Sequence, residues 1–269
     1  MDGMHLRYGR PLLAAPARLR AGALLACCAV LVAALGTLFA HQATADRLDQ
    51  AIDSPIIAWL GAHPGAAAWL AAPGSQLPAA VLSAAIVVAC LLTGRLNGAV
   101  LAAAAVPAAV GLNDGLCKPL VHRTYLGVLS YPSGHTATMF ALAATVAVLL
   151  FTPPRPAKAG ALRVLIPAAA CVLGCVVAVG VIALRWHYFT DTVAGAAVGI
   201  GTVCGLALLL DLPAVRQRLA RGSGQASAAQ ERRSAAAQAS GRSHSGRSAL
   251  IAVGRARPER SDLRCRRST

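Results

Sequence analysis

The sequence predicts an all-α, polytopic membrane protein with six transmembrane helices, short interfacial helices after the first span and a disordered C-terminal tail. Three observations support this fold class. Hydrophobic residues make up 57% of the chain, charged residues make up only 13%, and the apolar residues are gathered into blocks of membrane length. A soluble fold of 269 residues would need a more polar surface. We therefore expect a multi-pass protein of the plasma membrane.

Six uncharged stretches are long enough to cross about 30 Å of hydrocarbon as helices. The first follows a basic segment, and we interpret it as a retained span rather than a signal peptide, because its apolar run exceeds the about 7 to 15 residues of a signal core. The short segment 94–96 predicts a tight hairpin between the second and third spans. The predicted spans are residues 21–40, 77–93, 97–112, 136–151, 164–184 and 192–210.

Three regions differ in composition. Residues 1–20 form a basic N-terminus, residues 21–212 form the predicted six-helix domain, and residues 213–269 form an Arg-rich tail. The tail has too few large apolar residues to offset the entropy of ordering, so we expect disorder from about residue 222 onward. Two alternatives stand for its arginines, contact with anionic lipid or simple solvation.

Residues 41–76 differ from the rest of the six-helix domain in composition and hydrophobic pattern. Acidic residues, Asp46 and Asp49 among them, precede a helical spacing of aliphatic and aromatic residues that includes Ile56 and Trp59. This pattern predicts short amphipathic helices at the membrane interface.

The location of the basic residues predicts the orientation. Of 25 Lys and Arg, 13 lie beyond Leu212, so the net charge of +15 does not indicate a nucleic-acid-binding surface. The N-terminus, residues 94–96, the loop 152–163 and the tail carry most of the charge, and by the positive-inside rule they face the cytoplasm. Segments 41–76, 113–134 and 185–191 then face outward. Both termini are predicted to be cytoplasmic.

A polar motif, Pro132-Ser133-Gly134-His135, opens the fourth span. The start of a helix offers unpaired amides and the positive end of the helix dipole, so a histidine, a hydroxyl and a glycine amide there favour an anion. We interpret the motif as half of a phosphate site. The alternative is a turn that merely starts a helix, with Pro132 in the first turn and Ser133 as a cap.

A second group of polar residues opens the sixth span. His187 and Asp191 are four residues apart, so on a helix they share a face and the carboxylate accepts the imidazole N–H. The other ring nitrogen is then free as a nucleophile. Arg185, Lys118 and Arg123 would supply three cations on the same outer side for phosphoryl oxygens. The alternatives are an interfacial aromatic belt around His187 and ordinary flanking charges.

These residues resemble the PAP2 superfamily, the phosphatidic-acid-phosphatase-type membrane lipid phosphatases, over about residues 117–195. The family has six helices and three motifs. The second motif matches in full, the third matches at His187 and Asp191, and the first matches at Lys118. The family's motif arginines fall on Tyr125 and Val181 in this chain, so we expect Arg123 and Arg185 to replace them from nearby positions.

The resemblance implies a metal-independent phosphatase that acts on a lipid or polyprenyl phosphate or diphosphate, of the phosphatidic-acid-phosphatase or undecaprenyl-diphosphatase type. His187, oriented by Asp191, would attack phosphorus, and His135 would act as acid and then base. Lys118, Arg123, Arg185, Ser133 and Gly134 would bind the phosphoryl oxygens. We expect no cofactor and no metal site, since no carboxylate cluster suited to Mg²⁺ lies near these residues. The expected partners are the lipid phosphate and membrane lipids; the sequence indicates no oligomeric state.

Two other function classes remain as alternatives. A transporter would also place His, Asp and Arg at membrane depth, but it would carry polar residues or helix breaks near the middle of several spans. A non-catalytic PAP2-like binding protein would explain the displaced arginines.

Overall fold

The computed structural model describes residues 11–151 and 160–213. Within these residues six helices are long and apolar enough to cross a membrane, which confirms the predicted number of spans. The predicted disordered tail lies outside the described residues. The candidate spans are Ala15–Leu38, Pro64–Leu92, Leu96–Val121, Gly134–Phe151, Leu162–Ala183 and Phe189–Leu210.

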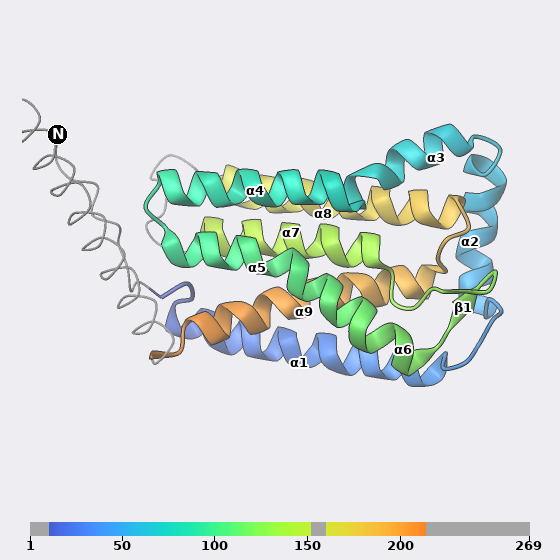
Figure 1. The fold of residues 1–269 in the computed structure, drawn as a ribbon, viewed down its shortest axis with the longest axis horizontal. Helices are drawn as coiled ribbons and strands as arrows, with labels where there is room; N and C mark the ends of the chain where they lie inside the picture. The colour runs from blue at the N-terminus through green and yellow to red at the C-terminus, as the bar shows by residue number, and fades with distance from the viewer. Residues whose placement is uncertain (1–10, 152–159, 214–269) are drawn as a thin grey trace, which may run out of the picture. The chain divides into compact units, whose positions relative to one another are not determined.

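The long helices run side by side as a bundle (Figure 1). α7 and α9 form its centre and are the most deeply buried of them, while α1 packs along α9, and α8 packs along α7. The short link between α4 and α5 turns at Gly94, whose φ of 68° suits glycine, so the predicted hairpin is confirmed. The helices are α1 (Ala15–Leu38), α4 (Gln76–Leu92), α5 (Leu96–Leu112), α7 (Gly134–Phe151), α8 (Leu162–Ala183) and α9 (Phe189–Leu210).

Glycines set the distance between α7 and α9. A Cβ on Gly195 would lie 2.3 Å from the Ser133 carbonyl oxygen, and one on Gly199 would lie 2.2 Å from the Ala137 carbonyl oxygen. Only glycine permits this approach, as in the small-residue interfaces of membrane helices. The amide of Ser133 consequently reaches the carbonyl oxygen of Asp191 at 2.9 Å. The starts of α7 and α9, which carry the two predicted histidine motifs, are thus held together.

The segment 41–76 contains the expected short helices, α2 (Arg47–Leu60) and α3 (Pro64–Ala71), followed by the single turn η1 (Ala72–Gly74). Asp46 caps α2 by accepting a hydrogen bond from the Asp49 amide at 2.7 Å. The structure differs from the prediction at α3. It continues through η1 toward α4, and the stretch Pro64–Leu92 is one candidate span. The reason is tertiary, because α3 packs closely against Gly180 of α8.

The polar segment 113–134 is more ordered than its composition predicts. The helix α5 continues through a π-helical turn, η2 (Asn113–Cys117), into α6 (Lys118–Val121), which ends at His122 with φ 53°. A small antiparallel hairpin follows, β1 (Thr124–Tyr125) and β2 (Val128–Leu129). Asn113 is buried and donates to the Pro132 carbonyl at 3.2 Å, so this segment is tied to the start of α7.

Candidate active site

A cleft of about 650 Å³ lies at the end of the bundle where α7 and α9 begin. It is built from segments far apart in the sequence: η1 with the start of α4, the α5–α6 region, the β hairpin, the first turn of α7 and the α8–α9 link. The predicted residues Lys118, Gly134, His135, Arg185 and His187 all line it. The other lining residues are Gly74, Ser75, Gln76, Val110, Asp114, Tyr125, Leu126, Val128, Leu129, Thr138 and Trp186.

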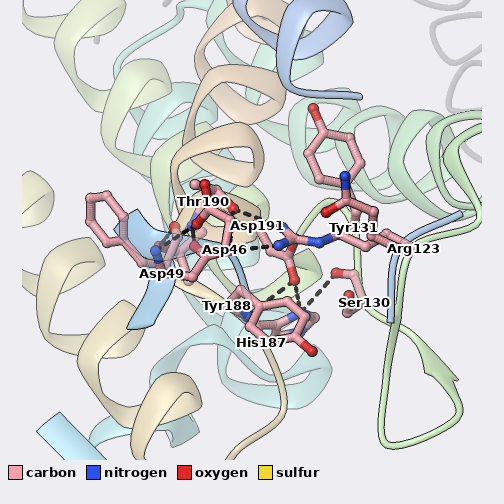
Figure 2. A network of polar contacts seen from close by, with 12 residues as sticks. Asp46, Asp49, Arg123, Ser130, Tyr131, His187, Tyr188, Thr190 and Asp191 are labelled. Atoms are coloured by element: carbon pink, nitrogen blue, oxygen red, sulfur yellow. Dashed lines mark hydrogen bonds and ion pairs between the residues drawn. The ribbon is translucent and has the colours of Figure 1, made fainter. Parts of the chain in front are cut away.

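His187 lies in the α8–α9 link and is 8% exposed. Its Nδ1 is 2.8 Å from the backbone carbonyl oxygen of Ser130 (Figure 2). Because a carbonyl can only accept, Nδ1 carries the proton and Nε2 is left with its lone pair. The sequence predicts that Asp191 accepts this proton, but its Oδ2 is 4.0 Å from Nδ1. The Ser130 carbonyl therefore fixes the tautomer, and the Asp191 carboxylate lies beside the ring beyond hydrogen-bond distance.

Burial, together with the neighbouring His135 and Lys118, lowers the pKa of His187 to about 3. An imidazolium in this position would lose its hydration and face positive neighbours. His187 is therefore neutral at physiological pH. A neutral imidazole with an unprotonated Nε2 is a nucleophile or a base.

His135 lies in the first turn of α7, at the helix start that the sequence motif predicts. Its ring is 5.5 Å from the ring of Trp186, which precedes His187 in the chain. One imidazole from α7 and one from the α8–α9 link therefore line one cleft, an arrangement suited to acid–base chemistry on a bound group.

Two cationic side chains, Lys118 and Arg185, line the cleft. Lys118 Nζ is 2.8 Å from Asp114 Oδ1, one helical turn away. Arg185 follows the end of α8 with φ 58°, and its side chain is exposed. Tyr125, which stands at a motif-arginine position, also lines the cleft, and its ring packs against Tyr188 at 4.4 Å.

Arg123, expected to bind phosphate, is placed elsewhere. It is fully buried and lies outside the lining of the cleft. Its Nη1 is 2.7 Å from Asp191 Oδ1, its Nη2 is 2.5 Å from Asp49 Oδ2, and Figure 2 shows it between these carboxylates. The rings of Phe39 and Tyr188 cover it at 4.2 and 4.3 Å. The geometry therefore places Arg123 against Asp191 and Asp49, and not in the cleft lining with Lys118 and Arg185.

Ser133 is also placed differently from Gly134. Its side chain is buried, and its amide donates to the Asp191 carbonyl, so that amide is already used. Gly134 lines the cleft. The structure therefore brings together His187, His135, Lys118, Arg185 and Gly134, and it places Asp191, Arg123 and Ser133 behind them.

The sequence reasoning missed two buried carboxylates on α2. Asp49 Oδ1 accepts from the Thr190 amide at 2.9 Å, and Asp53 Oδ1 accepts from the Phe189 amide at 3.1 Å. These amides open α9 and have no partner within the helix. Burial raises the pKa of Asp53 to about 7, and the nearby Asp49 carboxylate adds to the shift. The acidic start of the amphipathic segment was the feature of the sequence that could have indicated these carboxylates, and it does not predict that they bind the amides at the start of α9.

Comparisons with known proteins agree with this architecture. A family model described as PAP2 superfamily matches residues 79–212, about half of the chain. The crystal structure of a transmembrane PAP2 type phosphatidylglycerolphosphate phosphatase from Bacillus subtilis matches with a TM-score of 0.51 and 18% identity. The match covers 69% of this chain and 93% of that chain, and it shows a shared fold.

No curated protein sequence matches the chain. The matched residues 79–212 nevertheless contain both histidine motifs and every predicted site residue. The chain belongs to the PAP2 superfamily and is a membrane phosphatase of that family.

Proposed function

We propose that this protein hydrolyses a lipid or polyprenyl phosphate or diphosphate through a phosphohistidine intermediate, without a metal ion, at the extracytoplasmic face of the membrane. One observation carries the proposal. His187 and His135 line the same cleft, and His187 donates its Nδ1 proton to the Ser130 carbonyl, which leaves Nε2 unprotonated.

In the first step Nε2 of His187 attacks phosphorus, and the bond between phosphorus and the leaving oxygen breaks. His135 gives its proton to that oxygen. In the second step a water gives a proton to His135 and attacks phosphorus, the P–N bond breaks, and inorganic phosphate leaves. Both histidines return to their starting state.

The transferred group carries negative charge on its oxygens, so the site must supply positive charge and N–H donors. Lys118, Arg185 and the Gly134 amide are suited to this because they line the cleft with both histidines. The low pKa of His187 also supports the proposal, since the nucleophile is available without first losing a proton.

An apolar groove supports a substrate with a hydrocarbon tail. The groove has a volume of about 550 Å³ and lies between α4 and α5. Gln76, Val110 and Thr138 line both this groove and the catalytic cleft, so the two are continuous. A phosphate head in the cleft and a tail between the helices fit this geometry.

The proposed orientation rests on charge. The cleft lies at the end of the bundle where α7 and α9 begin. In the sequence, most of the basic residues fall in the segments 1–20, 94–96, 152–163 and 213–269, which alternate with the segments that contribute to the cleft, and the positive-inside rule assigns these basic segments to the cytoplasm.

The test is phosphate release from a short-chain lipid phosphate by the purified protein in detergent with EDTA. His187→Ala and His135→Ala should each lower the rate at least about 10²-fold, the typical worth of an acid–base group. His63→Ala is the matched control, because His63 is exposed at the same end and lies outside the cleft lining, and it should keep the wild-type rate.

A labelled phosphoryl group should be retained on the wild type after alkaline quenching and should be absent from His187→Ala. Equal rates in the wild type and both histidine variants would reject the catalytic assignment, and an inactive wild type would favour a binding protein. Loss of all activity in EDTA, restored by a divalent metal, would reject the metal-independent route.

A further inference from the structure

Asp49 belongs to a buried network that joins α2 to the site. Its Oδ2 is 2.5 Å from Arg123 Nη2 and 3.1 Å from Thr190 Oγ1, and its Oδ1 accepts from the Thr190 amide. The side chains of Asp49, Arg123 and Asp191 are all 0% exposed. Asp49 also lies outside the residues 79–212 that the family model matches.

The charges in this network set the net charge that lies beside the His187 ring. Arg123 holds Asp191 Oδ1 at 2.7 Å, and an arginine paired with one carboxylate cancels its charge. Asp49 holds the other end of the same guanidinium. The unit of two carboxylates and one guanidinium therefore has a net charge of −1, and its Asp191 Oδ2 is 4.0 Å from His187 Nδ1.

That remaining charge matters in the reaction. When Nε2 of His187 bonds to phosphorus, the imidazole ring gains positive charge. A net negative unit beside the ring stabilises this charge, and the effect is strong because buried charges are poorly screened. A neutral Arg123–Asp191 pair would give much less stabilisation.

We propose that Asp49 is a positioning residue for phosphoryl transfer: it neutralises Arg123, so that Asp191 keeps its negative charge for His187, and it anchors the first turn of α9. The inference rests on the proposed role of His187 as the nucleophile. Asp49 acts through Arg123 and Asp191 and does not touch the substrate.

The first test is Asp49→Asn, which keeps an acceptor for the Thr190 amide and removes the charge. We expect kcat to fall about 10- to 100-fold and KM to change less than about twofold, since a charge felt mainly in the transition state is lost. Asp46→Asn is the matched control. Asp46 is on the same segment and caps α2, and Arg123 is not its partner, so kcat should stay within about twofold of wild type.

The second test is the double variant Asp49→Asn/Arg123→Gln. It removes one positive and one negative charge, so Asp191 again carries the net charge. We expect kcat at least about tenfold above that of Asp49→Asn, because the two substitutions compensate. A purely structural role predicts the opposite, since two buried partners are then lost and the damage adds.

The readouts separate the possible outcomes. An unchanged kcat per folded Asp49→Asn enzyme, or a double variant slower than Asp49→Asn, overturns the inference. If Asp49→Asn does not fold, the double variant still tests the inference, because its kcat should remain within about tenfold of the wild-type kcat. A wild type without phosphatase activity would refute the proposed function, and this inference with it.

Discussion

Individual residues divide into those that line the cleft and those that hold them in place. His187 has both kinds of neighbour, with Lys118 and His135 on the cleft side and Ser130 and Asp191 behind it. The Ser130 carbonyl fixes the proton on Nδ1, and burial with the two neighbours on the cleft side keeps the ring neutral. The same side chain would be an ordinary interfacial histidine without these neighbours.

Asp53 should make stability depend on pH. Its pKa is raised to about 7, mainly by burial and then by the Asp49 carboxylate. This pKa lies above the value of about 3.9 for an aspartate in the unfolded chain. The contribution of Asp53 to stability is therefore fully present below about pH 3.9 and is lost as the pH rises through about 7. Asp53→Asn keeps an acceptor for the Phe189 amide and cannot ionise.

The measurement is thermal unfolding in detergent between pH 5 and 8. Relative to the wild type, the Tm of Asp53→Asn should improve as the pH rises and be higher by at least about 4 °C at pH 8. Asp46→Asn serves as the control for removing a nearby carboxylate. A difference between Asp53→Asn and wild type that does not change with pH would contradict the prediction.

At the scale of elements, the contact between α7 and α9 aligns the two histidine motifs. Gly199 allows the helix backbones to meet, with its hypothetical Cβ 2.2 Å from the Ala137 carbonyl oxygen and 2.7 Å from the Ala141 nitrogen. Both obstacles are backbone atoms, which cannot rotate away.

Gly199→Ala should therefore lower both stability and activity. We expect a loss of about 1–3 kcal/mol, typical of overpacking, and a lower kcat because Ser133 and Asp191 are pushed apart. Gly205→Ala is the matched control on the same helix, since its nearest neighbour is the Leu25 side chain at 3.8 Å, and alanine there should be neutral or slightly stabilising. Unfolding in denaturant and phosphate release measure both effects, and equal stability of the two variants would contradict the argument.

The sequence predicted the long elements well and the short ones poorly. The uncharged runs predicted the six spans, because burial in lipid depends on the local composition of the chain. The short segment at Gly94-Arg95 predicted the hairpin. The continuation of α5 into η2 and α6, and the β hairpin after it, depend on contacts such as Asn113 with Pro132. Such contacts join segments that are distant in the sequence, so no local sequence pattern predicts them.

At the scale of the whole bundle, two apolar grooves of similar size open between helices. One lies between α4 and α5 and shares lining residues with the cleft that contains His135 and His187. The other, of about 510 Å³, lies among α1, α5 and α9 and shares none of its lining residues with the cleft. From Gln76 to Val88 the first groove follows α4 for about 18 Å, which exceeds half of an about 30 Å hydrocarbon core.

This difference predicts where a bulky residue harms the reaction. Ala80→Phe fills the first groove and should lower kcat/KM for a long-chain lipid phosphate at least about tenfold, since burial of each methylene is worth about 0.8 kcal/mol. Activity on a water-soluble short-chain phosphate should be unchanged. Ala29→Phe, in the second groove, is the control and should affect neither substrate. Equal effects of the two variants on both substrates would mean that the first groove does not hold the tail.

The sequence by itself determined the six membrane spans and the family, and it identified four residues that line the cleft, Lys118, His135, Arg185 and His187. This was possible because composition and motif spacing are local properties of the sequence. Only the tertiary structure decided that Arg123 lies behind the cleft and that Asp49 completes its pairing. The physical reason is that the role of a charged side chain depends on which opposite charge and how much water it meets. Asp49 and Arg123 meet across 74 positions of the chain.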